Sequence, residues 1–467
     1  MDGSDSTQKS GCPRCRELEA EVERLQRQLA KLQAHVQRLT AQLDETRRAG
    51  KRQAAPFRRR QLVPDAQKKS PGRPPGHEPA HRAAPDFFDC VFDVPLAGCP
   101  QCGGPLQDRQ RHEQTQIDIP AEVLPQMRKF VLESGYCPCC QKRFQSRHPR
   151  QTSDAIAAAA HQIGPNALAF ALDAKYRLGM PLRKICDLLE RIFLLPIAPG
   201  TIVRASQRIA RAAEPTFQQL RAELRASSVV NVDETGWRVY GKNAWLWVFT
   251  TPELTIYCVR HSRGHEILLE VLGEEFGGIV GCDGFAAYRL LGCLKAQCLA
   301  HLLRRAAELE TTQVGRAVQF PRVVAKLLRE AIRVGSQRDT YSARGFAGQV
   351  TRLERRLDRV LQARLCSEPN RKFRDHLRRH RDEIFTFLHH DNVEPTNNAA
   401  ERATRLGVIV RKISAGNRSE TGAHAQGILT SLVVTCCQRG HDFIQWIRDL
   451  LELPQPQPVP IPIVNSS

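Results

Sequence analysis

The sequence predicts a multidomain α/β protein, on three observations. Leucines and valines repeat at heptad spacing near the N-terminus, two pairs of cysteines stand at metal-ligand spacing, and apolar runs later in the chain end on aspartates. The chain has 467 residues, too many for one ordinary domain, and its 41% of hydrophobic residues can form folded cores. A net charge of +20, from 69 Lys+Arg against 49 Asp+Glu, indicates a polyanionic partner, most commonly nucleic acid.

The hydropathy pattern argues against a membrane or secreted protein. No uncharged apolar run approaches the roughly 18–20 residues of a membrane span, and the first residues lack the apolar stretch of a secretory signal. We therefore expect a soluble intracellular protein. In a reducing compartment, clustered pairs among its 16 cysteines are more often metal ligands than disulfides.

The first predicted element is a coiled coil over residues 18–43. Apolar residues follow alternating spacings of four and three, with valines and leucines at position a and leucines at position d. A helix docked on its own chain is the alternative, but so narrow an apolar seam favours self-association. Residues 47–82 are rich in Lys, Arg and Pro, and predict an extended cationic linker that is either solvated or lies along DNA.

Two cysteine pairs predict a structural zinc site. Cys99 and Cys102 form one Cys-x-x-Cys turn, and Cys137 and Cys140 form the other. Each turn places two thiolates on one edge of a tetrahedron, so the two pairs can close a four-cysteine zinc site.

The residues around these pairs predict a zinc ribbon with an unusually long hairpin. Strand-like runs at 116–119 and 129–132 lie between the two turns. Cys139 is a spare or alternative ligand. Cys12 and Cys15 supply two ligands only, so they could close a site only across a dimer, and coincidence is the simpler interpretation.

Residues 151–222 have a helical pattern. An alanine-rich run is followed by a helix over 175–193 and another over 199–213, with a short turn through Pro196 between the last two. Two such helices can form a helix-turn-helix whose second helix enters the major groove of DNA, and plain packing is an equally good interpretation.

After residue 226 the apolar pattern becomes strand-like. The run Val229–Asp233 ends on a carboxylate, and so does the run Gly278–Asp283. Between them we expect a hairpin of strands at 244–250 and 254–259 and a helix at 265–272, and a fifth strand is expected at 295–299. Three antiparallel strands, a helix and a further strand are the order of a ribonuclease-H-like fold.

A late helix completes a candidate metal site. It begins near Thr396, ends at Gly407 and carries Glu401. Carboxylates from two strands and one helix, Asp233, Asp283 and Glu401, can hold two Mg²⁺ or Mn²⁺ ions for phosphoryl transfer, one ion activating the attacking hydroxyl and the other stabilising the leaving oxygen.

Each of these acids alone is more often a turn former or a solvated residue, but their combined order on apolar strands favours the metal site. Glu234 is a competing ligand, although strand alternation points its side chain to the opposite face from Asp233.

The combination of motifs resembles the transposases of the insertion sequence 66 family over nearly the whole chain. The matching features are the leucine-rich coil, the paired cysteines, Asp233-Glu-Thr, Asp283-Gly-Phe-Ala-Ala-Tyr288, Cys298-Leu-Ala-His301 with Arg304-Arg305, Asn397-Asn-Ala-Ala-Glu401-Arg, and Arg411-Lys412.

The resemblance implies a DDE transposase with Asp233, Asp283 and Glu401 as its catalytic triad. Such an enzyme cuts DNA at the inverted repeats of its element and joins the freed 3′ ends to a target. The resemblance also implies a bacterial, cytoplasmic and nucleoid-associated protein that forms a homo-oligomer through its coil, and it suggests companion proteins. One alternative is a catalytically inactive, sequence-specific, zinc-dependent DNA-binding protein, and another is a metal nuclease that releases cut ends without joining them.

The long stretch between Asp283 and Glu401 predicts a helical insertion dense in arginine, whose cations either contact DNA or form a solvated face. His301 could lie beside the metals, although a packed or hydrogen-bonded histidine is the commoner role. The candidate DNA-binding residues are Arg304, Arg305, Arg405, Arg411 and Lys412.

The expected domains are a coiled-coil helix (1–46), a basic Pro-rich linker (47–86), a zinc-ribbon-like domain (87–150), a helix-turn-helix-like region (151–222), the first part of the catalytic core (223–300), a helical insertion (301–390), the last part of the core (391–453) and a disordered Pro-rich tail (454–467).

Overall fold

The computed structural model describes two units of the chain, Met1–Ile117 and Asp118–Ser467. The described residues are 21, 22, 24–26, 28, 29, 33, 87–94, 99–105, 107, 110–111, 113–120, 123–151, 154, 156, 163–453 and 457–463. Among these residues, no helix is long and apolar enough to cross a membrane.

In the first unit, the described residues between 21 and 33 are helical. The side chains of Val22, Leu25 and Leu29 on the expected heptad seam are exposed in the single chain. The rest of the seam, the linker over 47–86, and Cys12 and Cys15 lie outside the described residues, so the coiled coil stays a prediction.

The prediction of zinc-ribbon strands at 116–119 and 129–132 is wrong. Those residues form no strand, and the hairpin instead joins β1 (Ser134–Cys137) to β2 (Lys142–Gln145) around the second cysteine turn. Ile119 and Val131 are 79% and 84% exposed, so the apolar alternation has nothing to bury against. Without such burial, an alternating pattern does not fix a strand.

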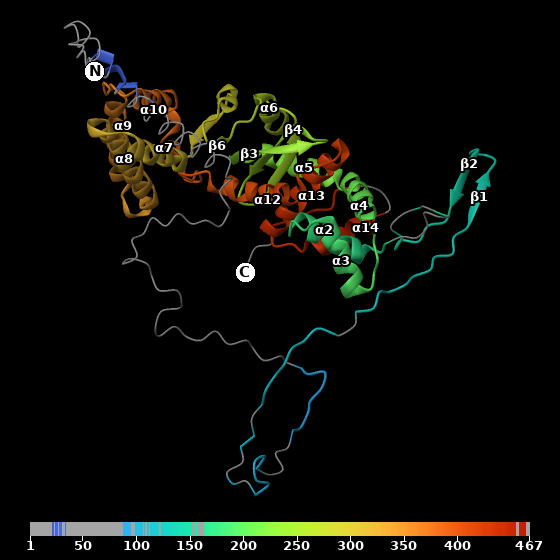
Figure 1. Ribbon diagram of the computed structural model, residues 1–467. Helices are drawn as coiled ribbons and strands as arrows, with labels where there is room; N and C mark the ends of the chain where they lie inside the picture. The colour runs from blue at the N-terminus through green and yellow to red at the C-terminus, as the bar shows by residue number, and fades with distance from the viewer. Residues whose placement is uncertain are drawn as a thin grey trace, which may run out of the picture. The chain divides into compact units, whose positions relative to one another are not determined.

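A five-stranded sheet forms the centre of the second unit (Figure 1). Its strands are β3 (Val229–Val239), β4 (Lys242–Thr250), β5 (Thr255–Arg260), β6 (Ile279–Cys282) and β7 (Leu294–Gln297). Their order across the sheet is β5-β4-β3-β6-β7, with β3, β4 and β5 antiparallel and with β6 and β7 parallel to β3. This agrees with the strand sequence expected for the catalytic core.

The largest departure from the predicted strand boundaries is at β3. β3 does not end at Asp233 but runs on to Val239 and turns back into β4 through Tyr240 and Gly241. The buried side chains of Trp237 and Val239 hold this extension on the sheet. Asp233 therefore lies in the middle of a strand rather than at its end.

The helices around the sheet are α2 (Pro165–Tyr176), α3 (Leu182–Phe193), α4 (Pro199–Ala212), α5 (Glu214–Arg225), α6 (His265–Leu272), α13 (Glu420–Gln438) and α14 (Phe443–Glu452). α3 packs with α2 and α4 in a small core of its own. The other six helices share one hydrophobic core with Val230 and Val232 of β3. Through α2, α4 and α5, the helix-turn-helix-like region expected over 151–222 thus packs with the sheet.

The helix predicted over 175–193 is two helices. α2 ends at Tyr176 and α3 begins after Pro181, which has an extended backbone. Gly179 between them has a φ of +68°, a left-handed conformation that stops a helix.

The other face of the sheet is covered by α12 (Asn398–Ser414), the helix that carries Glu401. α12 does not end at Gly407, as the sequence predicted, but continues for two more turns. Gly407 is buried where the helix approaches β4 so closely that a Cβ atom would lie 2.2 Å from Leu246 Cδ2. The glycine thus serves close packing rather than helix termination.

α13 also lies along β5, the outer strand of the sheet. Two backbone N–H groups of β5 donate to side-chain hydroxyls of this helix, Tyr257 to Ser431 at 2.8 Å and Thr255 to Thr435 at 3.2 Å. These buried hydroxyls accept hydrogen bonds from the two N–H groups, which would otherwise be free to pair with a neighbouring strand.

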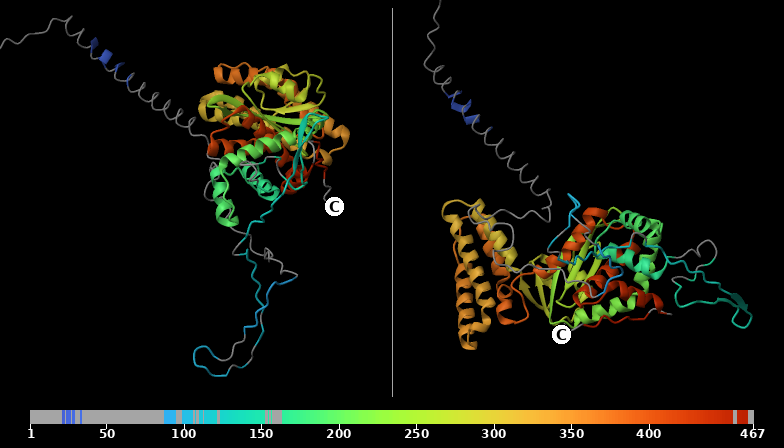
Figure 2. Two further views of the ribbon diagram at one scale, coloured as in Figure 1. Left: turned by 90° about the vertical axis from the view of Figure 1, so that its right-hand side faces the viewer. Right: turned by 90° about the horizontal axis from the view of Figure 1, so that it is seen from below.

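The stretch between β7 and α12 is the expected helical insertion. It comprises α7 (Leu299–Thr312), α8 (Gln319–Ser336), α9 (Ala343–Leu361), α10 (Glu368–Arg379) and α11 (Thr386–His389), with short 3₁₀ turns η4 (Gly315–Val318), η5 (Arg338–Thr340) and η6 (Arg381–Glu383). These helices have a hydrophobic core of their own, and Figures 1 and 2 show α8, α9 and α10 gathered at one end of the sheet. At the β7 edge, the Thr386 hydroxyl donates to the Lys295 carbonyl at 2.7 Å.

The Pro-rich tail was expected to be disordered, but residues 457–463 pack on the body of the unit. The Val459 N–H donates to Thr216 Oγ1 at 2.8 Å, and the Ile461 carbonyl accepts from Arg439 at 2.5 Å. Ile461 is itself buried. Prolines supply no N–H donors, but the residues between them still offer carbonyls and apolar side chains to the core.

Candidate metal-dependent active site

Asp233 and Asp283 come from adjacent parallel strands. Asn231 of β3 is paired with Gly281 of β6, and Asp283 follows two residues later, directly after β6. A Cβ atom on Gly281 would lie 2.2 Å from Asn231 Oδ1, so the two strands approach closely just before the aspartates. Asp283 lies close enough for its charge to raise the pKa of Asp233, so the two acidic residues are near each other.

The surroundings of Asp233 disfavour its charged form. Burial raises the pKa of Asp233 to about 6, and the negative charges of Glu234 and Asp283 add to the rise. The nearby Thr404 hydroxyl opposes it, although that oxygen makes no hydrogen bond of normal geometry with the described residues. A buried carboxyl with acidic neighbours is a group that a bound cation would stabilise.

Asp283 stands in a tight turn directly after β6. Its Oδ1 accepts the Phe285 N–H at 2.9 Å, and the turn leads into the 3₁₀ segment η3 (Ala286–Leu290). Gly284 has a φ of +83°, and a Cβ atom there would meet the Gln297 side chain at 2.7 Å. The glycine after the aspartate is thus fixed both by backbone conformation and by packing.

The N-terminus of α12 is tied to β3 and to the start of α7 through Asn397. The Asn397 side-chain amide donates to the Val232 carbonyl at 2.7 Å, one residue before Asp233. Its backbone N–H donates to Cys298 Sγ at 3.1 Å, and nearby the Leu299 N–H donates to the Pro395 carbonyl at 2.9 Å. These bonds hold the first turn of α12, and with it Glu401, against the sheet.

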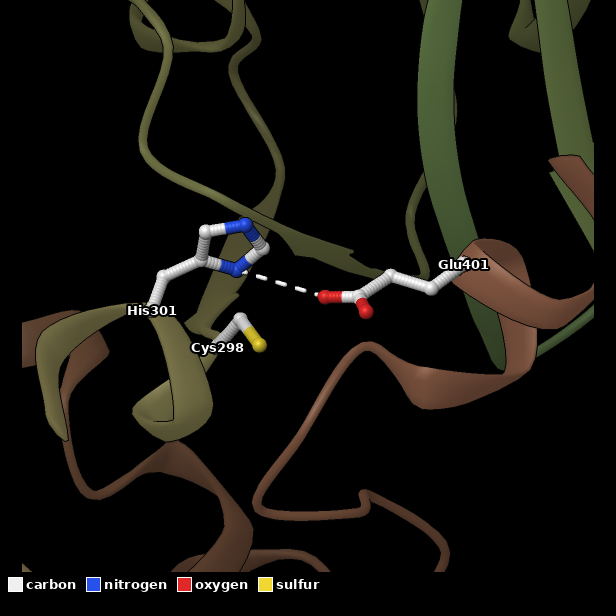
Figure 3. Close-up of side chains that lie close together, drawn as sticks. All are labelled: Cys298, His301 and Glu401. Carbon is white, nitrogen blue, oxygen red and sulfur yellow. Dashed lines mark ion pairs between the residues drawn. The ribbon is translucent and has the colours of Figure 1, made fainter. Parts of the chain in front are cut away.

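Glu401 faces His301 and Cys298 at the start of α7 (Figure 3). His301 Nδ1 lies 3.6 Å from Glu401 Oε1. Among the described residues, these three side chains form the group of potential metal ligands whose atoms all lie within 4.8 Å of one another. Asp233, Asp283 and Glu401 do not form such a group. The three carboxylates of the expected triad are therefore not within 4.8 Å of one another.

Cys298 and His301 influence each other electrostatically. Burial raises the pKa of the Cys298 thiol, but His301 and the Asn397 N–H outweigh burial and hold that pKa below its ordinary value. The thiol in turn raises the pKa of His301. Sequence reasoning noted both residues as parts of a motif but gave Cys298 no role, because nothing in local spacing links α7 to the first turn of α12.

Glu234 points away from Asp233, as strand alternation predicted. Its carboxylate is 2% exposed and is held by three donors: Arg263 Nε at 2.9 Å, Arg263 Nη2 at 2.6 Å and Tyr288 Oη at 2.7 Å. The Arg263 guanidinium also stacks on the rings of Trp245 and Phe285. Since Tyr288 lies in η3, this cluster ties the strand of Asp233 to the turn of Asp283.

The candidate DNA-binding cations have different surroundings. Arg304 on α7, and Arg405 and Lys412 on α12, are exposed. Arg305 is half-buried, with its guanidinium 5.2 Å from the centre of the Phe373 ring. Arg411 donates to Thr235 Oγ1 at 3.2 Å and to the Gly236 carbonyl, so its charge fastens α12 to β3.

Each candidate zinc turn is formed separately. Around the first, the Cys99 N–H donates to the Gly104 carbonyl, and Gly103 has a φ of +74°. Backbone hydrogen bonds from Gln101 and Cys102 lower the pKa of Cys99. At the second, backbone hydrogen bonds from Cys140 and Cys139 lower the pKa of Cys137. The two pairs belong to different units, so the four-cysteine site stays a prediction.

The residues near Asp233 and Glu401 suit a divalent cation. Three buried oxygens there, Asn397 Oδ1, Glu401 Oε1 and Thr404 Oγ1, have no hydrogen-bond partner among the described residues. Carboxylate and amide oxygens are the hard donors that Mg²⁺ and Mn²⁺ prefer. Asp233, Asp283 and Glu401 are therefore the residues that could hold such an ion.

The sheet, its two aspartates and the helix bearing Glu401 fit a transposase domain. Residues 160–425 match the family described as "Transposase IS66 family", and this match spans more than half of the chain. The chain belongs to this family. This membership supports a role in transposition.

One curated relative is the Uncharacterized protein y4qI of Sinorhizobium fredii (strain NBRC 101917 / NGR234). It is 25% identical over 237 residues, which cover 44% of this chain and 43% of the relative. The chain thus matches less than half of that relative's length.

Proposed function

We propose that the protein is a DDE-type transposase that cuts DNA at the inverted repeats of an insertion sequence and joins the 3′ ends to target DNA. Asp233, Asp283 and Glu401 are its catalytic carboxylates. The observation that supports this proposal is that Asp233 and Asp283 come from neighbouring parallel strands, near enough for the charge of Asp283 to raise the pKa of Asp233, while α12 with Glu401 covers one face of the same sheet.

The metal ligands of this proposal are the same three carboxylates. Bound Mg²⁺ or Mn²⁺ would supply Lewis-acid activation of the attacking oxygen and charge stabilisation of the leaving oxygen. Asn397 positions Glu401 by fixing the first turn of α12 to β3. Burial raises the pKa of Asp233 to about 6, so its carboxylate is available to a metal above that pH and progressively less below it.

Contacts with DNA and between copies of the chain are further parts of the proposal. The exposed cations Arg304, Arg405 and Lys412 are the candidates for phosphate contact, since Arg305 and Arg411 are engaged by the protein itself. The heptads over 18–43 would hold the protein as a homo-oligomer, and a four-cysteine zinc site would stabilise the segment that follows the linker.

An excision and joining assay in cells tests the catalytic proposal. The donor carries a marker between the DNA flanks native to this gene, and the wild type is compared with Asp233→Asn, Asp283→Asn and Glu401→Gln. Glu275→Gln, which changes an exposed acid between α6 and β6, is the matched control. We expect insertions from the wild type and the control, and none from the three carboxylate variants, with binding of the flanks retained.

The other outcomes separate the alternatives. Insertions that survive Asp283→Asn contradict the triad. Cut ends that are never joined to new DNA favour the metal nuclease. Flank binding by the wild type without excision points to a missing companion protein or to a silent DNA-binding protein, and purified protein with Mn²⁺ and a pre-cut end distinguishes these two.

A further inference from the structure

A second kind of metal ligand borders the carboxylate site. The two residues that face Glu401 are the thiol of Cys298 and the imidazole of His301. Cys298 caps the N-terminus of α7 and His301 lies in its first turn, so that positions three apart present both side chains on one side of the helix. The third group arrives from the first turn of α12, which Asn397 anchors.

The two atoms that face one another form an ion pair at 3.6 Å but no hydrogen bond. His301 Nδ1 and Glu401 Oε1 are both buried and make no hydrogen bond with any described residue. A buried polar atom without a hydrogen bond is destabilising unless a partner is supplied. A cation between the two would supply it for both.

The spacing suits a tetrahedral metal. Ligand atoms about 2.1 Å from a zinc ion at tetrahedral angles lie about 3.4 Å apart. His301 Nδ1 and Glu401 Oε1 are 3.6 Å apart, close to that edge. The thiol of Cys298 completes a group whose three ligand atoms all lie within 4.8 Å of one another.

The chemistry of the three donors selects the metal. Mg²⁺ avoids thiolate sulfur, whereas Zn²⁺ and Co²⁺ bind sulfur, imidazole nitrogen and carboxylate oxygen together. The Asn397 N–H that donates to Cys298 Sγ is the kind of outer hydrogen bond that orients a metal-bound thiolate. About a third of the His301 and Glu401 side chains is exposed, which leaves a fourth position open to water or phosphate.

We propose that Cys298, His301 and Glu401 form a binding site for Zn²⁺ or a similar thiophilic divalent metal, distinct from the four-cysteine site. Binding there rests on the local geometry alone. One consequence rests on the proposed function. Glu401 cannot bind a metal at this site and also a Mg²⁺ held with Asp233 and Asp283. Zn²⁺ at this site therefore inhibits Mg²⁺-dependent DNA cleavage.

Cobalt titration of the full-length protein tests the site without any DNA. Metal-free protein is titrated with Co²⁺, and the ultraviolet charge-transfer band of the cobalt–thiolate bond is followed. Because the predicted four-cysteine site can also bind Co²⁺, the titration is run in wild-type protein and in a Cys102→Ser/Cys140→Ser background. In each, Cys298→Ser is compared with Cys293→Ser, a matched control at a half-buried cysteine five residues away.

We expect Cys298→Ser to lose about one equivalent of Co²⁺ and its share of the charge-transfer band in both backgrounds, and Cys293→Ser to lose neither. His301→Gln, at a partly exposed residue whose loss leaves the core intact, keeps the thiol and should weaken Co²⁺ binding by more than about 100-fold. That is above the roughly 10–100-fold cost of losing an outer partner.

Equal stoichiometry and spectra for Cys298→Ser and Cys293→Ser would overturn the site, and so would unchanged affinity in His301→Gln. Both results are independent of catalysis. If Co²⁺ binds as expected but Asp283→Asn still joins DNA ends, the metal site stands and the proposed catalytic triad fails.

Discussion

Removing Arg263 should destabilise the catalytic core through the carboxylate it neutralises. Glu234 is buried with a side-chain exposure of 2%, and Arg263 supplies two of its three hydrogen bonds. Breaking a buried ion pair from one side costs about 3–5 kcal/mol, because the remaining charge has no compensation. Arg263 is 37% exposed and water can partly replace it, so we expect about 3 kcal/mol for Arg263→Met.

A double-mutant cycle measures how much of this cost is electrostatic. In a Glu234→Gln background no buried charge remains, and Arg263→Met should cost only about 1 kcal/mol for the lost stacking on Trp245 and Phe285. The coupling is therefore about 2 kcal/mol. Arg191→Met, which breaks the exposed pair with Asp187, is the control and should cost less than about 0.5 kcal/mol.

Calorimetric unfolding of the full-length protein is the assay. For a folded region of this size, a loss of 3 kcal/mol corresponds to a drop of roughly 5 °C in Tm. If Arg263→Met has the same effect with Glu234 as with Gln at that position, the coupling is absent and the electrostatic reasoning is refuted.

Three further predictions concern other parts of the molecule. Gly407→Ala forces a Cβ atom to 2.2 Å from the Leu246 side chain and should cost about 1–3 kcal/mol of unfolding free energy, measured by calorimetry; an unchanged Tm would show that α12 can shift. Burial first, and neighbouring cations second, lower the pKa of His376 to about 4, so the neutral form is favoured in the fold and stability is lost as pH falls from about 6.5 toward 4. Relative to His376→Gln, the wild type should lose about 1–2 kcal/mol over that range by chemical denaturation, and parallel curves would contradict the assignment. Cys102→Ser with Cys140→Ser should lower bound zinc by about one per chain in metal analysis, and unchanged zinc would exclude these ligands.

The order of the sheet could be predicted because each of its elements has a strong local signal. The helix at His265–Leu272 has the expected bounds, and the strand before Asp283 is one residue shorter at each end than the predicted run. Periodicity alone does not separate a short apolar run from a buried helix, so the length of each segment and the turn residues that bound it are what identify it.

The misplaced boundaries have tertiary causes. Glu234-Thr-Gly after Asp233 looks like a turn, but Trp237 is buried beyond it and keeps the chain in the sheet. Gly407 looks like a helix end, yet the residue is a contact point with Leu246. A glycine can end a helix or allow close packing, and only the residue packed against it shows which of the two applies.

The candidate site was predictable in its acids but not in its neighbours. Asp233, Asp283 and Glu401 each stand on a recognisable element, and their roles stay a proposal. The sequence suggested that His301 could lie beside the metals, but the closeness of Cys298 to Glu401 was not predictable, because the whole helical insertion separates the two residues in sequence.

The coverage of both outer strands limits how this protein can assemble. The helix α13 lies along β5, and the Thr386 hydroxyl of α11 takes a β7 carbonyl. An incoming strand from another chain would have to displace these groups before it could pair. Copies of the protein can therefore be crowded together without their sheets fusing, and contacts between them are left to helices and loops.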